Sequence, residues 1–335
     1  MLKQLAENAG SALYEITSSP PGQVQRLIFT APETRAICNE SLVLGWDYTQ
    51  KLRAACQRAL ELLGGIGCCP LQQHRTVIHH ILRGGLNFGL REAAAGAFGW
   101  NLHGSSFVSA QRERDAQDPE SWRIVESGYN KIFLPARAQI VAGDVVASGT
   151  SLRYGLDTLV QQAAHDQVEL ESMLVFTIGG IKTEEVLAEL DARCREVFPR
   201  YRTTTLCYLE GRFTVPSPLT PLSIRITGTD LVRCGALMAP EFLESQYVDP
   251  AFPLERCVIY DAGSRAFCLP EYLDDVVHYW REVAALAERG MTFEQQLRER
   301  APELDPARFG EVDLGTLAAR QIERLRAVLS GGNEA

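Results

Sequence analysis

Short apolar runs alternate with segments of helical periodicity along the middle of the chain. The apolar runs, several of them rich in β-branched residues, predict strands at Thr76–Leu82, Ser105–Ser109, Ala138–Ala142, Glu171–Ile178 and Thr203–Leu209. The segments between them predict helices at Leu90–Phe98, Ser151–Gln162 and Thr183–Val197. This alternation is typical of an α/β fold in which helices flank both faces of a mostly parallel sheet.

The segments on either side of this pattern differ from it. Residues 1–70 are predicted to form an N-terminal helical extension, because Leu44–Leu63 places its apolar residues near one helical face. The core is predicted to span 71–268 with an irregular, proline-containing insertion or hood at about 210–256, including a hairpin near Ser223–Ile226. A C-terminal helical extension is predicted at 269–335, with helices at Glu271–Glu288, Thr292–Arg300 and Leu314–Leu329.

Composition narrows the class of protein. The 335 residues include 33 Lys+Arg and 42 Asp+Glu, which gives a net charge of −9 without any block of cations. Because neutralising phosphates requires clustered cations, no nucleic-acid partner is expected. No apolar stretch is long enough to predict a membrane helix, and the first residues lack a continuous apolar signal segment.

The cysteine pattern also bears on localisation and chemistry. The chain has 9 cysteines, which are scattered and form no CxxC motif. Scattered cysteines without an export signal predict free thiols in a reducing cytoplasm, where they act as small buried hydrophobic residues. A zinc or redox role is the less favoured interpretation.

The segment from Gln139 to Leu152 carries the clearest chemistry. A hydrophobic strand delivers Asp144 near its carboxyl end, where α/β proteins place ligands. The following loop, Ala147–Ser151, offers backbone N–H groups, hydroxyls and the positive end of a helix dipole, which suit a phosphate monoester. Asp144 could accept hydrogen bonds from sugar hydroxyls or help to hold a divalent metal. A plain strand-to-helix turn with a serine N-cap explains the same residues.

This segment resembles the phosphoribosyl diphosphate (PRPP) signature of type I phosphoribosyltransferases. In that register Gly143 and Asp144 occupy the acidic pair, and Ser148, Gly149, Thr150 and Ser151 occupy the loop that binds the 5-phosphate. The sequence departs from the family at the first acidic position, which is Gly143. It also departs at Ala147, where purine enzymes carry an aspartate but uracil enzymes carry alanine. The resemblance is therefore closest to uracil phosphoribosyltransferase-like proteins.

Three further segments extend the resemblance. Ile81–Leu86 is similar to the family's diphosphate loop and contributes Arg83, Gly84 and Gly85. Gln111–Asp115 lies where the family has a mobile arginine loop, with Arg112 as the best match and Arg114 as the alternative. Ile259–Phe267 is similar to the stretch that recognises the base, which makes Asp261, Ala262 and Gly263 base-binding candidates; a surface turn is the alternative.

The resemblance implies a phosphoribosyltransferase-type sheet and phosphoribosyl transfer from PRPP to a nucleobase, with a pyrimidine-like base favoured and diphosphate released. It implies that Arg83 and Arg112 stabilise the diphosphate, that Asp144 holds the ribose hydroxyls, and that Ala147–Ser151 bind the 5-phosphate. Asp144, Arg83 and Arg112 are therefore the catalytic candidates. Mg²⁺ is the implied cofactor, indirectly held by Asp144, and a homodimer that serves nucleotide salvage is implied.

Two alternatives belong to other classes. A PRPP- or nucleotide-sensing protein would keep the pocket and lack the reaction, and the unfamiliar C-terminal helices favour this interpretation. A different α/β enzyme that binds another phosphorylated sugar would not bind PRPP at all.

Overall fold

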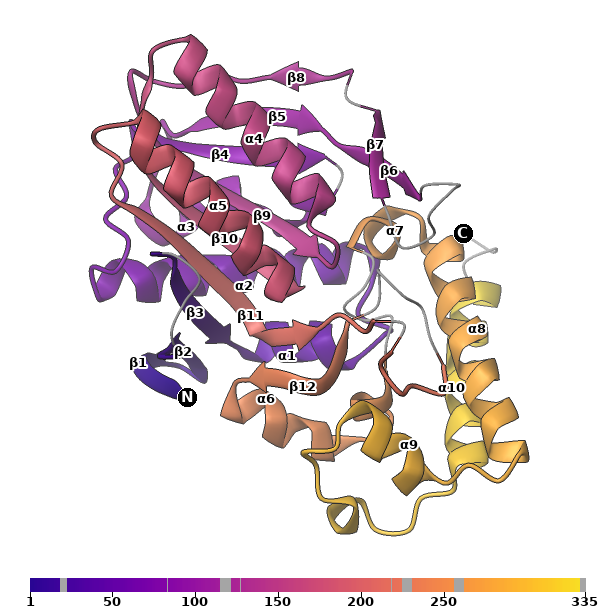
Figure 1. Cartoon of the computed structure of the whole chain (residues 1–335). Coiled ribbons are helices and arrows are strands. Elements are labelled where there is room, and N and C mark those ends of the chain that lie inside the picture. The colour runs from indigo at the N-terminus through magenta and orange to yellow at the C-terminus, as the bar shows by residue number, and fades with distance from the viewer. Residues whose placement is uncertain are drawn as a thin grey trace.

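A long, mostly parallel sheet organises the molecule (Figure 1). The computed structural model describes residues 1–18, 23–82, 84–114, 122–126, 128–217, 219–224, 231–255 and 262–331. Within these residues the main sheet has 10 strands. Its parallel run follows the order β3-β11-β10-β9-β4-β5. The bounds of these strands are β3 Gln25–Thr30, β4 Thr76–Leu82, β5 Gly104–Ser109, β9 Arg137–Val146, β10 Glu169–Gly180 and β11 Thr203–Thr214.

Helices cover both faces of this sheet, which confirms the predicted α/β class. In Figure 1, α4 and α5 lie over one face, and α2 and α3 lie behind it. His79 and His80 are adjacent in β4 and therefore point to opposite faces of the sheet. His79 Nε2 lies 3.1 Å from the Gly155 carbonyl in α4, and the His80 ring stacks at 4.8 Å on Phe107 of the neighbouring strand β5. The helices are α2 Gly45–Gly65, α3 Leu90–Phe98, α4 Thr150–His165 and α5 Ile181–Val197.

The prediction of a helical extension at 1–70 is wrong for residues 1–30. The chain there forms β1 (Leu2–Asn8), β2 (Ser11–Ile16) and β3, followed by α1 (Pro32–Asn39). β1 and β2 form an antiparallel hairpin that joins the sheet through β3. Its turn residues Ala9 and Gly10 have φ values of 48° and 76°, as a primed hairpin turn requires. Alanine rarely adopts a positive φ, so the sequence gives no ordinary signal of this turn.

The predicted insertion begins with an ordered extension of the sheet. β11 continues to Thr214 and pairs antiparallel with β12 (Val232–Met238). Short helical elements follow, and the predicted hairpin near Ser223–Ile226 lies partly outside the described residues. These elements are α6 Pro240–Ser245, η2 Gln246–Val248, η3 Phe252–Leu254 and α7 Ala262–Phe267.

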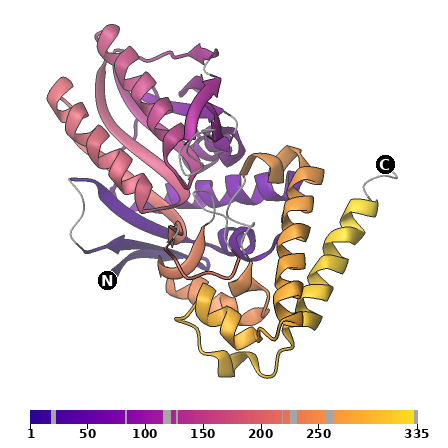
Figure 2. The ribbon, with the colours of Figure 1, turned by 45° about the vertical axis from the view of Figure 1, so that its right-hand side comes forward.

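The C-terminal helices have a hydrophobic core of their own. α8 and α10 lie side by side, as both views show (Figures 1 and 2). Their buried residues include Val276, Trp280 and Leu325, and Leu254 of the insertion joins the same cluster. All three helices predicted in this region are present. The elements are α8 Leu269–Glu288, α9 Phe293–Arg300, η5 Pro306–Phe309 and α10 Leu314–Gly331.

Two predictions, one about membrane helices and one about the cysteines, can be compared with the described residues. Among them, no helix is both long enough and apolar enough to span a membrane. The eight cysteines in this part of the chain are free, and five of them are buried, as expected for small apolar side chains. The buried ones are Cys38, Cys56, Cys69, Cys194 and Cys207.

Candidate functional site

Two turns leave the sheet at the carboxyl ends of neighbouring strands. β4 and β9 are parallel partners, with Thr76 opposite Gln139 and His79 opposite Ala142. β4 leads into η1 (Gly84–Phe88), and β9 leads through Ala147 into α4. Since parallel neighbours end at the same edge of a sheet, the predicted diphosphate and 5-phosphate turns lie side by side.

The two turns approach each other closely at Gly84 and Gly85. A Cβ added to Gly84 would lie 3.1 Å from Asp144 Oδ1, and one added to Gly85 would lie 2.9 Å from the Gly143 carbonyl oxygen. Neither glycine has a φ in the left-handed region, so lack of space accounts for both residues. The sequence predicted that these glycines let the backbone approach a bound anion. In the structure they let the η1 turn approach β9.

Asp144 lies near the carboxyl end of β9, two residues before the strand ends at Val146, because the strand continues beyond the predicted bound at Ala142. Its side chain is buried at 8% exposure, and its Oδ1 accepts a hydrogen bond from the Val145 N–H at 2.9 Å. The contact with Gly84 directs this carboxylate toward the η1 turn. One carboxylate thus lies against the predicted diphosphate turn, on the strand that leads into the predicted 5-phosphate turn.

The loop after β9 leads into the start of α4 through small residues. Gly149 is the N-cap of α4, with φ 79°, and a Cβ on it would lie 3.1 Å from Val186 Cγ2. The Ser148 and Thr150 hydroxyls are 3.1 Å apart, and no side chain of the N-cap residue caps the helix. Glycine, not serine, occupies the N-cap position, although the Ser148 hydroxyl accepts a hydrogen bond from the Thr150 N–H at 3.4 Å.

A third turn joins this edge beside the loop. Ser151 Oγ donates to the Ala110 carbonyl at 3.3 Å, which connects the start of α4 to the end of β5. After Ala110 the chain forms an antiparallel hairpin of β6 (Gln111–Arg114) and β7 (Trp122–Glu126), which packs against α4. The sequence had predicted an irregular charged loop here. Strand pairing replaces it in the described residues.

The structure describes some of the predicted cations and base-binding residues but not others. Arg83 and Asp261 lie outside the described residues. The backbone of Arg112 pairs with Ile124 in the β6–β7 hairpin. Ala262 and Gly263 begin α7, which packs against η1 and α2. The described part of the candidate base-binding segment therefore starts a helix that contacts the predicted diphosphate turn.

Sequence reasoning missed two buried hydroxyls near the same edge. Thr177 pairs with Asp144 across β9 and β10, and its Oγ1 is buried without a hydrogen-bond partner, as is that of Thr183. A Cβ added to Gly179 would lie 2.8 Å from the first hydroxyl and 3.0 Å from the second. Threonine within an apolar strand gives no motif, and only the burial of an unpartnered polar atom reveals these residues.

Two buried carboxylates were also missed. Glu184 is fully buried and forms ion pairs with Arg26 at 3.0 Å and Arg212 at 3.1 Å. Glu210 has a φ of 66° and accepts hydrogen bonds from the Thr30 hydroxyl at 2.7 Å, from the Ala31 N–H and from the Thr34 hydroxyl. Burial raises the pKa of Glu210 to about 7, although these donors act in the opposite direction.

The described residues contain no cluster of three or more His, Cys, Asp or Glu side chains that could hold a metal ion. A cation at this edge would depend on Asp144 together with oxygens of a ligand. This arrangement suits Mg²⁺, which proteins often bind through one or two carboxylates plus substrate phosphates.

These contacts define an α/β protein with a candidate binding edge built from turns at adjacent parallel strands. A comparison with protein-family profiles and one with curated proteins gave no match. Among solved structures, the chain is similar to hypoxanthine phosphoribosyltransferase from Trypanosoma cruzi in a ternary substrates complex, at 13% identity over 63% of this chain and 92% of that chain, with a TM-score of 0.24. The assignments that follow depend on this chain's own geometry.

Proposed function

We propose that this protein transfers a phosphoribosyl group from PRPP to a nucleobase, with a pyrimidine-like base favoured, and releases diphosphate. One observation carries the proposal. Gly84, in the turn after β4, and Asp144, near the end of β9, lie so close together that a Cβ added to Gly84 would be 3.1 Å from Asp144 Oδ1. PRPP carries a phosphate at one end of a ribose and a diphosphate at the other. Two neighbouring anion-binding turns with one carboxylate between them match that layout.

The loop at Ala147–Ser151 is assigned to the 5-phosphate. Its support is the start of α4, where the first-turn N–H groups and the Ser148 and Thr150 hydroxyls lie together. The helix dipole favours a negative group at this position. Ser151 ties the loop to the end of β5 and so fixes its direction.

The η1 turn is assigned to the diphosphate, with Arg83, Gly84 and Gly85 as its binding residues and Arg112 of β6 as a second cation. Guanidinium groups match phosphate oxygens through paired hydrogen bonds. Asp144 is assigned to the ribose hydroxyls. Mg²⁺ would be held by Asp144 together with diphosphate oxygens, and when bound it would offset the charge of the departing diphosphate.

The chemistry follows from holding both ends of the donor. The bond from C1 of the ribose to the diphosphate oxygen breaks with its electron pair on the diphosphate. A ring nitrogen of the base then bonds to C1, and its proton passes to the departing diphosphate or to solvent. The chain contributes positioning and charge stabilisation, and the β6–β7 hairpin beside α4 is assigned to the exclusion of water.

A sensing protein is the second candidate, because one specific feature favours it. α7, where the candidate base-binding residues Ala262 and Gly263 lie, contacts both the η1 turn and α8 of the C-terminal helices. A ligand at η1 could therefore be read out through those helices without any reaction. In this reading PRPP or a nucleotide would bind and no diphosphate would be released.

A diphosphate-release assay over a panel of pyrimidine and purine bases tests the proposal, with PRPP and Mg²⁺ present. Release that depends on one pyrimidine-like base supports transfer. PRPP or nucleotide binding by calorimetry, without release for any base, supports sensing and contradicts transfer. The homodimer stays a prediction, and light scattering of the same preparation tests it.

A further inference from the structure

Arg265 is a buried cation near the proposed site. It lies in α7 and is 1% exposed. Its Nε donates to the Val43 carbonyl at 2.6 Å, its Nη1 to the Ile37 carbonyl at 2.9 Å, and its Nη2 to the Glu40 carbonyl at 2.9 Å. One guanidinium thus binds three backbone oxygens of a single stretch, which we call the 37–43 segment.

Aromatic rings enclose the same guanidinium. Its central carbon lies 4.8 Å from the ring of Tyr48 in α2 and 5.8 Å from the ring of Tyr272 in α8. Contacts of this kind stabilise a cation that has lost its water. α7 is therefore fixed at one point to α2, to α8 and to the 37–43 segment.

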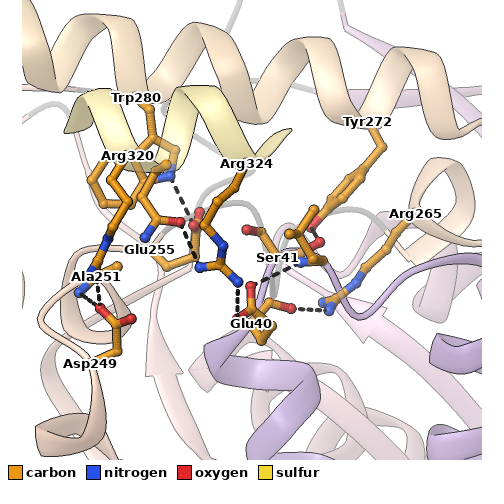
Figure 3. Close-up of polar contacts among 12 residues, drawn as sticks. Glu40, Ser41, Asp249, Ala251, Glu255, Arg265, Tyr272, Trp280, Arg320 and Arg324 are labelled. Carbon is orange, nitrogen blue, oxygen red and sulfur yellow. Dashed lines mark hydrogen bonds and ion pairs between the residues drawn. The ribbon is translucent and has the colours of Figure 1, made fainter. Parts of the chain in front are cut away.

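The 37–43 segment is itself held from several other directions. Tyr272 donates its hydroxyl to the Ser41 carbonyl at 3.1 Å, and Arg233 donates to the Cys38 carbonyl at 2.7 Å. Arg324 of α10 pairs with the Glu40 carboxylate at 3.0 Å (Figure 3). The 37–43 segment is thus bonded to α8, β12 and α10 as well as to α7.

α7 also contacts the proposed site. It packs against η1, whose Gly84 and Gly85 lie against β9. It starts at Ala262 and Gly263, two of the candidate base-binding residues. Arg265 thus lies two residues beyond these candidates, on a helix that contacts η1 and is bonded to the 37–43 segment.

We infer that Arg265 is a positioning residue for the acceptor: by binding three carbonyls of the 37–43 segment, it holds α7 against η1 and so sets where the base binds. This inference rests on the proposed function. Its consequence is that Arg265 affects binding of the acceptor and of the diphosphate end of PRPP, and leaves binding of ribose 5-phosphate at the loop after β9 unchanged. The C-terminal helices take part through Tyr272, which forms one wall of the Arg265 site.

The test compares Arg265→Lys with a matched control, Arg324→Gln. Lysine keeps the charge, but its single ammonium cannot reproduce the planar fork that reaches three carbonyls. Arg324 contacts the same residue, Glu40, but does so from α10 and through an ion pair whose arginine side chain is 38% exposed. We expect the KM for the base to rise about tenfold or more in Arg265→Lys. The KM for PRPP should also rise in Arg265→Lys, because η1 is assigned to the diphosphate, and should stay within a factor of about two in Arg324→Gln. Binding of ribose 5-phosphate, measured by calorimetry, should stay within a factor of about two in both variants.

Hydrogen exchange of the full-length protein gives a readout that does not require turnover. Arg265→Lys should speed amide exchange in η1 as well as in α7, whereas Arg324→Gln should leave η1 unchanged. Faster exchange confined to α7, or an unchanged KM for the base in an active enzyme, would overturn the positioning role. A wild-type protein that binds PRPP but releases no diphosphate would instead overturn the proposed function, and with it the acceptor role. If Arg265→Lys does not fold, Tyr272→Leu provides the second variant. It removes the ring that lies against Arg265, so the KM for the base should rise; an unchanged KM for the base in that variant would overturn the positioning role.

Discussion

Gly84 stands so close to Asp144 that even a methyl group at its Cα would lie 3.1 Å from the carboxylate. This contact connects two segments that are separated by about sixty residues of chain, and it brings the η1 turn against β9. Because glycine has no side chain, the Asp144 carboxylate can lie against the η1 turn. The proposed binding of an activated sugar phosphate depends on this position of the carboxylate.

Replacing Asp144 by Asn tests the role of this carboxylate. The amide keeps the shape and can still accept the bond from the Val145 N–H, but it removes the negative charge that would bind ribose hydroxyls. We expect turnover to fall about a hundredfold with little change in thermal stability. Asp166→Asn at the far end of α4 is the matched control and should keep full turnover. Wild-type turnover in Asp144→Asn would remove this residue from the site.

Replacing Gly85 by Ala tests the close packing of the η1 turn. A Cβ would lie 2.9 Å from the Gly143 carbonyl oxygen, so the backbone must shift. We expect a loss of about 1–3 kcal/mol in the free energy of unfolding, measured by urea denaturation. Gly65→Ala is the control, because nothing lies within 4 Å of that position at the end of α2. It should be neutral or stabilising by up to about 1 kcal/mol. Equal effects in both variants would contradict the observed packing.

The buried carboxylate of Glu210 predicts a pH-dependent stability. Its pKa is raised to about 7 from an ordinary value of 4.5, chiefly by burial. The folded state therefore binds the proton more tightly than the unfolded state, and stability is lost as the pH rises from about 4.5 to about 7. Glu210→Gln removes this loss and can still bond to the Ala31 N–H and the threonines. The variant should gain roughly 3 kcal/mol relative to wild type between about pH 5 and pH 8. A constant difference across that range would contradict the raised pKa.

The two adjacent histidines of β4 predict the opposite slope. Burial lowers the pKa of His79 and of His80 to about 4, so both rings are neutral near pH 7. The unfolded state binds protons first, and stability is lost as the pH falls from about 6.5 toward 4. Imidazole carbon shifts measured by NMR should show both rings neutral between about pH 5.5 and 8. A midpoint near 6.5 for either ring would contradict its burial.

The sequence predicted the parallel core because its elements carry strong local patterns. Thr76–Leu82 and Leu90–Phe98 are observed with the predicted bounds, as a β-branched run and an alanine-rich helix. The hairpin of β1 and β2 was missed because its turn uses Ala9 at a positive φ in place of an Asn-Gly signal. The predicted strand ended at Leu209, whereas β11 continues to Thr214. The prediction stopped early because Glu210 is a charged residue that is nevertheless buried inside the strand.

The order of the candidate site segments along the chain was predictable from the sequence, but the contacts between those segments were not. The motif at Asp144 identified the β9 edge, because phosphate-binding loops need small residues before a helix. The orphaned hydroxyls of Thr177 and Thr183 and the three carbonyl contacts of Arg265 depend on distant partners, which no local pattern records. Tertiary packing alone assembles these groups.

The most direct test of the central claim is calorimetric titration of the wild-type protein with PRPP, ribose 5-phosphate and diphosphate, each with Mg²⁺. If the β4 and β9 turns hold opposite ends of one ligand, PRPP should bind at least about tenfold more tightly than either half. Binding of ribose 5-phosphate as tight as that of PRPP, or no binding of PRPP, would contradict the claim.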